Sequence, residues 1–91
     1  MTHEERFGLF HKNNPRVYEL FKQFTFEVIN KGFRKWSADA VMHRVRWEAS
    51  VITDDPQFKI NNNYVAFYAR LFMAEYPQYQ GFFETRKRLS A

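Results

Sequence analysis

The feature that most constrains this chain is a helix-sized run from Asn61 to Pro77 that is apolar on almost every side. At about 3.6 residues per turn its apolar side chains cover two opposite faces, which only Arg70 and Glu75 interrupt. A helix that is hydrophobic all round must be buried. We therefore expect this run to form the central helix of a small helical domain.

The length of the chain limits the architecture to one domain. Its 91 residues supply one hydrophobic core, and Phe, Tyr and Trp make up 20% of them. Such a composition suits a small core, because large rings bury much apolar area. The predicted fold is all-α, a compact bundle of four or five short helices around the central apolar helix, with one extended arm. We expect a single domain over residues 1–91, in which residues 1–12 could fray.

Capping signals predict two helices before the central one. Thr2 and Glu5 match a capping box for a short helix over about residues 3–11. Asn14 is an N-cap residue, and Pro15 follows it at the first helical position. The apolar residues after Pro15 then recur at the spacing of one helical face, which indicates a second helix.

A basic and aromatic link separates the second helix, which Gly32 ends, from a third helix that Ser37 caps. Trp36 precedes this cap and could form a hydrophobic staple with Val41. The helix is expected from Ala38 to about residue 51. Its core face has the helical spacing and comprises Ala38, Val41, Met42, Val45, Ala49 and Ile52. Trp47 falls outside this face, so the third helix has a second apolar edge.

Two short segments complete the expected fold. Residues 58–60 alternate like a strand, and we expect an extended arm whose two apolar residues dock on the core. Pro77 ends the central helix, because proline cannot continue it. Residues 81–89 then predict a last, basic helix that is anchored by its two phenylalanines.

Positive charge is the main property that points to a partner. The chain has 14 Lys and Arg residues against 10 Asp and Glu residues, a net charge of +4. Arginine beside tryptophan suits phosphate and base contacts, and it equally suits a protein hot spot. The predicted binding residues are Arg34, Lys35, His43, Arg44, Arg46, Trp47, Arg86, Lys87 and Arg88. In the alternative interpretation these charges are a solvated face and Trp47 packs under the last helix.

Arg70 lies inside the apolar run and needs a separate explanation. A buried guanidinium keeps its charge, so it requires carboxylate or carbonyl partners. We predict that Arg70 is a structural clamp to Glu48, Glu84 or the C-terminus of a helix. A functional role for Arg70 is the alternative.

The sequence lacks the patterns of common catalytic and metal sites. The absence of Cys excludes disulfides and thiolate nucleophiles, and His3, His11 and His43 do not have the spacing of metal ligands. Asp39 and His43 lie four residues apart on one helix, but no Ser or Thr nucleophile stands at an elbow beside them. We expect a protein that is not an enzyme and binds no metal and no cofactor.

No apolar run approaches the ~18 residues of a transmembrane helix, and the N-terminus does not have the layout of a signal peptide. These two observations predict a cytoplasmic protein that does not associate with a membrane.

Five segments together carry a resemblance to a group of proteins. They are Asn14-Pro15-x-Val17-Tyr18, Arg46-Trp47-Glu48, residues 58–64, Tyr68-Ala69-Arg70-Leu71 and residues 82–86. Over roughly residues 14 to 88 the chain resembles a family of small proteins, without an established activity, that phages and prophages encode. The resemblance implies a mobile element in a host cell, and it implies no mechanism.

Two functional classes fit these observations. The first is a nucleic-acid-associated accessory protein of a phage or mobile element, which the local positive charge favours. A helix-turn-helix is disfavoured, because the third and central helices are further apart than its turn of about three to four residues. The alternative is a protein-interaction module or inhibitor that binds a host protein of the nucleic-acid machinery, or that self-associates as a homodimer. The expected partner is therefore nucleic acid or a host or phage protein.

Overall fold

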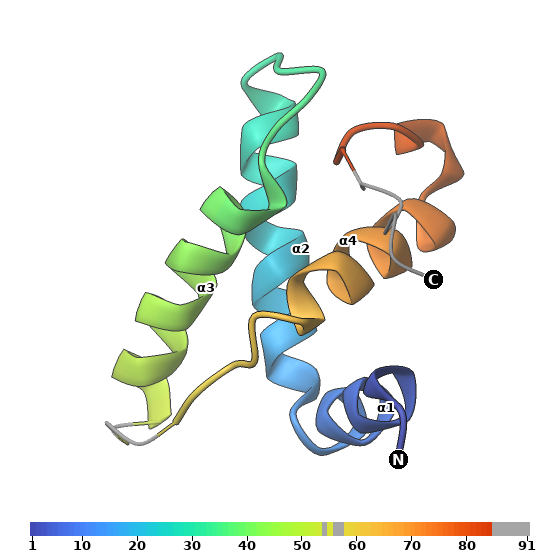
Figure 1. Ribbon diagram of the computed structural model, residues 1–91. Helices are drawn as coiled ribbons and strands as arrows, with labels where there is room; N and C mark the ends of the chain where they lie inside the picture. Colours follow the sequence, from blue (N-terminus) through green and yellow to red (C-terminus); the bar gives the residue numbers. More distant parts are fainter. Residues whose placement is uncertain (54, 56–57, 85–91) are drawn as a thin grey trace.

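The protein folds as a bundle of α-helices (Figure 1). A computed structural model describes residues 1–53, 55 and 58–84. Its elements are α1 (His3–Asn13), α2 (Pro15–Asn30), α3 (Ala38–Thr53), α4 (Tyr64–Glu75) and the 3-10 helix η1 (Pro77–Tyr79). The predicted all-α fold is confirmed. Within the described ranges, no helix is both long enough and apolar enough to cross a membrane.

The helices α2 and α3 run in opposite directions side by side, and α4 crosses them (Figure 1). α4 packs against α1, α2, α3 and η1, so its predicted central position is confirmed. α1 lies beside the beginning of α2 and also contacts α4. The turn between α2 and α3 lies at one end of the molecule and extends beyond the other helices.

Aromatic rings form most of the core. Phe21 on α2 and Tyr68 and Phe72 on α4 are fully buried, and Phe83 is almost fully buried. The Phe21 ring centroid lies 5.8 Å from that of Tyr68 and 5.4 Å from that of Phe83. These separations are in the range in which aromatic pairs add to the stability that burial provides. The aromatic excess of the sequence is therefore largely explained by the core.

The two apolar faces of α4 differ in burial. Val65 and Phe72 face the core, whereas Phe67 and Leu71 on the other face are only partly buried, and Ala74 is exposed. The expectation that the central helix is buried on all sides is therefore wrong. α1 covers the first part of the outer face, because the ring centroid of Phe67 lies 5.1 Å from that of an α1 phenylalanine.

The N-terminal helix is tied to the core. Its predicted capping box is confirmed, with Glu5 N–H donating to Thr2 Oγ1 at 3.1 Å and Thr2 N–H donating to Glu5 Oε1 at 3.3 Å. Phe7 is buried, and its ring centroid is 4.8 Å from that of Tyr68. The structure thus places residues 3–13 in a helix that contributes a core residue, rather than in a frayed end.

The segments around α4 differ in how well they were predicted. The extended arm at residues 58–60 is confirmed, with Ile60 buried and Phe58 half-buried. The predicted helix from residue 81 is wrong for residues 81–84, which are not helical. Gly81 has a φ of 86°, and Trp36 N–H donates to the carbonyl oxygen of Phe82 at 3.2 Å. The rest of that predicted helix lies outside the described residues, as do Arg86, Lys87 and Arg88.

Candidate nucleic-acid interface

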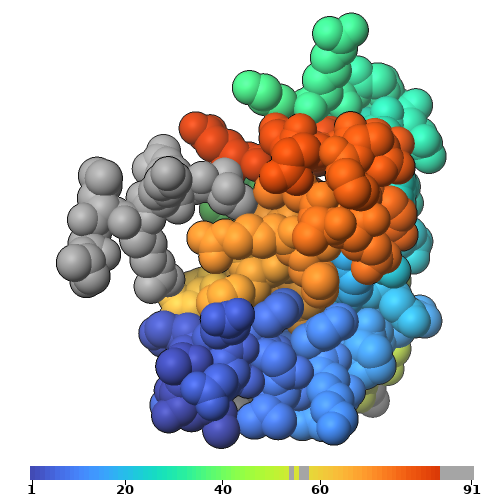
Figure 2. Space-filling model, turned by 90° about the vertical axis from the view of Figure 1, so that its right-hand side faces the viewer, coloured from blue at the N-terminus to red at the C-terminus, as the bar shows by residue number. Residues whose placement is uncertain are grey.

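The turn between α2 and α3 projects from the bundle, and we call its residues 31–36 the tip (Figure 2). Gly32, with a φ of 96°, ends α2, since this left-handed conformation strains other residues. The hydroxyl of Ser37 accepts a hydrogen bond from Ala40 N–H at 3.2 Å and so caps α3. Two local signals therefore fix where the tip begins and ends.

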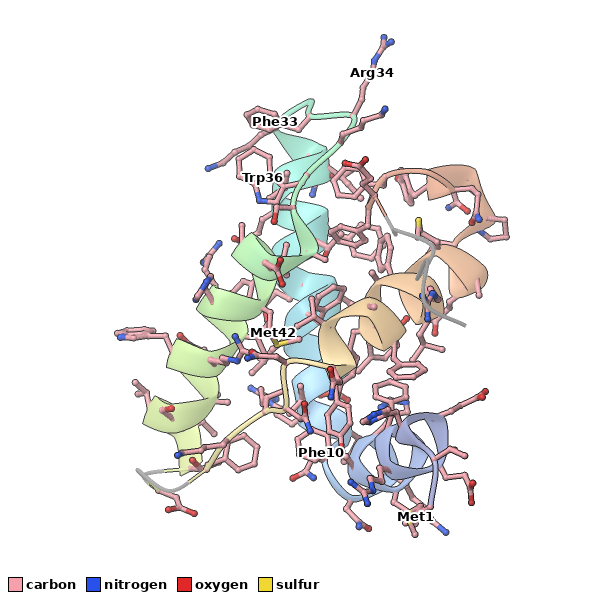
Figure 3. The ribbon with its side chains drawn as sticks, in the orientation of Figure 1. Met1, Phe10, Phe33, Arg34, Trp36 and Met42 are labelled. Carbon is pink, nitrogen blue, oxygen red and sulfur yellow. The ribbon has the colours of Figure 1, made fainter. Side chains whose placement is uncertain are left out.

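The tip exposes two aromatic rings. Phe33 is 48% exposed and Trp36 is 38% exposed. Their ring centroids lie 4.8 Å apart with the planes inclined by 58°. Figure 3 shows the two rings beside each other at the end of the bundle, with Arg34 pointing away from the molecule. Exposed rings of this kind can stack with a base or pack on a partner.

The tip also carries three cations. Lys31, Arg34 and Lys35 are exposed, and in the part of the chain that the structure describes none of them forms an ion pair. The tip sequence itself contains no acidic residue. Its positive charge is therefore available to an anionic ligand.

The base of the tip is anchored in the core. In addition to the hydrogen bond from Trp36 N–H to Phe82, Trp36 forms an isolated parallel β-bridge with Phe83. Phe82 and Phe83 are both buried. The core therefore holds the backbone of Trp36 in place while its ring is exposed. This reduces the conformational entropy that the ring and its backbone lose when a ligand binds.

The predicted binding residues Arg44 and Arg46 both have partners within the fold. Arg44 forms an ion pair with Glu27 of α2 at 2.7 Å, and its guanidinium lies 4.1 Å from the ring centroid of Phe24. Arg46 donates to the carbonyl oxygen of Ile60 at 3.3 Å and to the side chain of Asn62. These arginines join α3 to α2 and to the arm before α4.

Arg70 has the opposite environment to the one predicted. It is exposed, and its guanidinium lies 5.8 Å from the ring centroid of Phe67. Among the described residues it forms no ion pair with Glu48, Glu84 or any other carboxylate. The prediction of a buried structural clamp at Arg70 is therefore wrong.

A second exposed apolar area lies on α3, on the side away from the core. Trp47 is 68% exposed and Val51 is 59% exposed. Ile52, expected in the core, is also exposed, whereas the other five predicted core positions of α3 are buried or partly buried. We call the stripe Ala40, Arg44, Trp47 and Val51, with His43 and Glu48 beside it, the α3 edge. The predicted second apolar edge of this helix is thus present.

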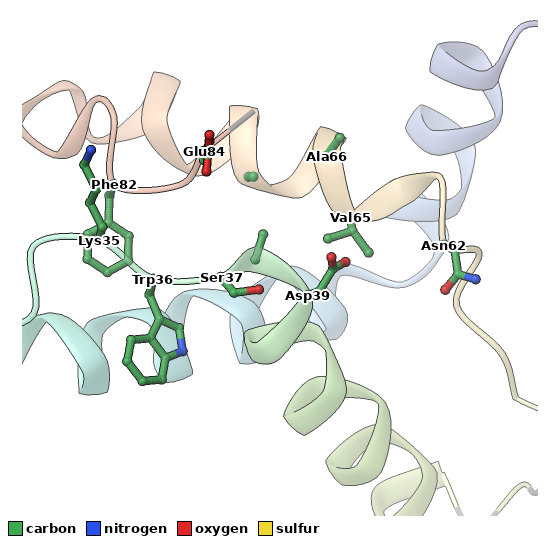
Figure 4. A pocket seen from close by; sticks show the side chains of 11 residues that line it. Lys35, Trp36, Ser37, Asp39, Asn62, Val65, Ala66, Phe82 and Glu84 are labelled. Carbon is green, nitrogen blue, oxygen red and sulfur yellow. The ribbon is translucent and has the colours of Figure 1, made fainter. Parts of the chain in front are cut away.

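A groove of about 810 Å³ lies between the beginning of α3 and α4 (Figure 4). Small apolar residues such as Ala66 and Ala69 line it, together with the carboxylates of Asp39 and Glu84. In Figure 4 the Asp39 side chain points into the space between the two helices. Lys35 and Trp36 of the tip also line the groove, so it adjoins the tip. Its two carboxylates repel phosphate, and we therefore do not count the rest of the groove as part of the basic surface.

The described residues do not bring together a recognisable catalytic group. Among them, no three His, Cys, Asp or Glu side chains cluster so as to hold a metal ion. Asp39 and His43 are both exposed, and the described hydrogen bonds do not join them. Burial raises the pKa of the Tyr68 hydroxyl, and burial followed by the charge of Glu75 raises the pKa of Tyr18. Both tyrosines therefore stay protonated at neutral pH.

The predicted binding residues include Arg34 and Lys35 but not Phe33 and Trp36. The sequence shows that Phe33 and Trp36 flank an arginine and a lysine, but it does not show that the two rings are exposed. Comparisons with protein-family models, with curated proteins and with solved structures found no match for this chain. The geometry of the tip must therefore carry the functional argument.

Proposed function

We propose that this protein is a non-enzymatic nucleic-acid-binding protein and that the tip is its contact surface. The observation that carries the proposal is an exposed aromatic pair, Phe33 and Trp36, within a cluster of cations that have no ion-pair partner among the described residues. The resemblance to phage and prophage proteins supports an accessory role in a mobile element.

The two kinds of side chain at the tip have different tasks in this proposal. Lys31, Arg34 and Lys35 contact phosphates, and this contribution falls as salt rises because counterions are released on binding. The rings of Phe33 and Trp36 stack with bases, and each stacked base contributes about 1 to 3 kcal/mol with little dependence on sequence. Together they make a small site of low sequence specificity.

Single-stranded nucleic acid fits the tip better than a duplex does. Stacking on a side chain requires an unpaired base, and the tip presents rings rather than a helix that could enter a groove. α4 is largely buried, and the two arginines of α3 among the predicted binding residues, Arg44 and Arg46, have partners within the fold. The proposed ligand is therefore a short single-stranded segment of DNA or RNA.

Fluorescence anisotropy with labelled single-stranded oligonucleotides, measured over a series of salt concentrations, tests the proposal. The parent protein should bind more weakly as salt rises. An Arg34→Ala/Lys35→Ala variant should bind more weakly and with a shallower salt dependence, by about 0.7 in the log–log slope for each lost phosphate contact. Phe33→Ala should reduce affinity about 5-fold or more and leave the slope unchanged.

A Lys12→Ala/Lys59→Ala variant is the matched control. Both lysines are exposed, neither forms an ion pair among the described residues, and their removal changes the net charge by the same amount. Equal losses in the control and tip variants would contradict a localised site. If the parent binds no oligonucleotide at low salt, the proposal fails, and a protein that co-purifies after nuclease treatment would then indicate the alternative function.

A further inference from the structure

The exposed stripe of the α3 edge has the spacing of a helix that packs against another helix. Ala40, Arg44, Trp47 and Val51 follow one another in steps of four, three and four residues, which is the spacing of a helix-packing seam. The stripe lies opposite the buried residues of α3. α3 stands at the left edge of the molecule in Figure 1, with α2 on its inner side. Among the described elements, none covers this stripe.

The stripe is complementary to the same stripe of a second copy when the two α3 helices run antiparallel. A two-fold axis opposite the midpoint between Arg44 and Trp47 makes two α3 helices antiparallel. Arg44 then faces Trp47 of the second copy, and the small Ala40 faces the larger Val51 of the second copy. A two-fold interface repeats each of these contacts, because residue i meets j and j meets i.

The centre of the stripe is shaped to receive a ring. A hollow of about 270 Å³ is lined by His43, Arg44, Trp47 and Glu48, and it lies at the proposed axis. The guanidinium of Arg44 is already held in place by Glu27 and Phe24, and 57% of the side chain remains exposed. A guanidinium fixed in this way is a ready platform on which an indole ring can stack.

The charges beside the stripe also match. Glu48 is partly buried, and in the described residues it forms no ion pair. In the antiparallel arrangement Glu48 lies next to Arg44 of the second copy, on the same side of the interface. Each copy therefore places Glu48, which has no ion pair among the described residues, beside an Arg44 side chain of the other copy that is more than half exposed although it already pairs with Glu27. Self-association forms this additional contact twice.

We propose that the α3 edge is a self-association surface on which two copies pack antiparallel, with Trp47 of each in the hollow of the other. One pair of helices of this length buries less area than the roughly 1,200 Å² of a standard interface, so the dimer is weak and forms as concentration rises. This proposal is independent of the tip, because the two surfaces share no residue.

Cysteine cross-linking tests both the contact and its direction, and the absence of native Cys removes background. Under mild oxidation at high concentration, a mixture of Ala40→Cys and Val51→Cys proteins should form covalent heterodimers. Either variant alone should form few, because identical positions are offset along the antiparallel helices by about 16 Å. The same offset separates residues 40 and 51 within one chain, so the chain cannot close the bond on itself.

Sedimentation of the protein without cysteines supplies the second measurement. The parent should shift from monomer toward dimer as concentration rises from low micromolar to millimolar, and Trp47→Asp should remain a monomer with unchanged helical circular dichroism. Phe33→Ala, which removes an exposed ring from the tip, should associate as the parent does. A parent that is monomeric throughout, or single cysteine variants that cross-link as fast as the mixture, would overturn the proposal.

Discussion

The tip and the α3 edge contain the same kinds of residue in different electrostatic states. Each exposes a tryptophan beside basic residues. At the tip the cations have no ion-pair partner in the described part of the chain, whereas Arg44 at the α3 edge is paired with Glu27. Composition alone would assign the two surfaces one function, and the structure separates them.

This difference indicates which ligand each surface suits. Free cations beside rings attract phosphate and let bases stack. A cation that is already neutralised and held flat contributes less long-range attraction and more to a packed interface. The distinction makes the tip the proposed nucleic-acid site and the α3 edge the proposed protein site.

The largest loss of stability should come from a substitution in the core, which serves as the reference for substitutions at the tip and at the α3 edge. Phe21→Ala should lower the free energy of unfolding by about 3 to 5 kcal/mol, because it removes a fully buried ring. Phe33→Ala and Trp47→Ala should each change it by less than about 0.5 kcal/mol. Chemical denaturation measures all three. A loss at Trp47 close to that at Phe21 would mean that the α3 edge stabilises the monomer.

The second largest loss of stability should come from Arg46, because its side chain binds the segment before α4. Arg46→Ala should lower the free energy of unfolding by about 1.5 kcal/mol, since it removes hydrogen bonds from a charged group to Ile60 and Asn62. Lys35→Ala at the tip is the control and should have little effect on stability. If the two variants unfold at the same denaturant concentration, Arg46 is not the link that its contacts indicate.

Arg44→Ala should also lower the free energy of unfolding, but by less than Arg46→Ala. Arg44→Ala loses an exposed ion pair and a contact with the Phe24 ring, which together contribute about 1 kcal/mol. A double-mutant cycle with Glu27→Ala isolates the ion pair, and its coupling should shrink in high salt. Arg34→Ala should leave stability unchanged and weaken oligonucleotide binding. The reverse pattern in these two variants would exchange the roles of the tip and the α3 edge.

The smallest effect concerns pH and involves neither surface. Burial acts to raise the pKa of Glu75, but hydrogen bonds from Tyr76, Lys22 and Tyr18 outweigh it and hold the pKa below its ordinary value of 4.5. The ionised Glu75 carboxylate therefore stabilises the folded state at every pH above the ordinary pKa. This stabilisation is lost as the pH falls through the lowered pKa of the folded state.

Thermal melts between neutral pH and about pH 3 measure this loss, since that interval spans the ordinary range of carboxyl pKa values. Glu75→Gln should make the decline shallower. Arg34→Ala, whose cation has no carboxylate partner among the described residues, should follow the parent. A decline in Glu75→Gln as steep as in the parent would remove Glu75 from the explanation.

Local signals made the helices predictable, and tertiary contacts explain the errors. The capping box at Thr2 and the proline at the start of α2 act within a few residues, so the sequence shows them. Arg44 finds Glu27 on another helix, and Arg70 lies on the outer side of α4. A helical projection gives the face of a residue but not which face meets another element, so it does not show that Arg44 and Arg46, rather than Arg70, join elements of the fold.

The C-terminal error has the same physical origin. Residues 82 and 83 are two consecutive phenylalanines, which fit a helix anchor in sequence. In the structure both are buried, and their backbone pairs with Trp36 of the tip, far away in the chain. Exposure of the tip rings likewise depends on where the rest of the bundle ends, so it could not be predicted from the sequence.

The placement of the tryptophans has an optical consequence. Both Trp36 and Trp47 are exposed, and the buried rings are Phe and Tyr. Indole emission depends on the polarity around the ring, so unfolding should shift the emission of Trp47, which is 68% exposed, less than that of Trp36, which is 38% exposed. A Trp47→Phe variant leaves one emitting indole at the tip, and Trp36→Phe leaves one on the α3 edge. Quenching by an oligonucleotide should then be seen only from Trp36, and a spectral shift with rising protein concentration only from Trp47.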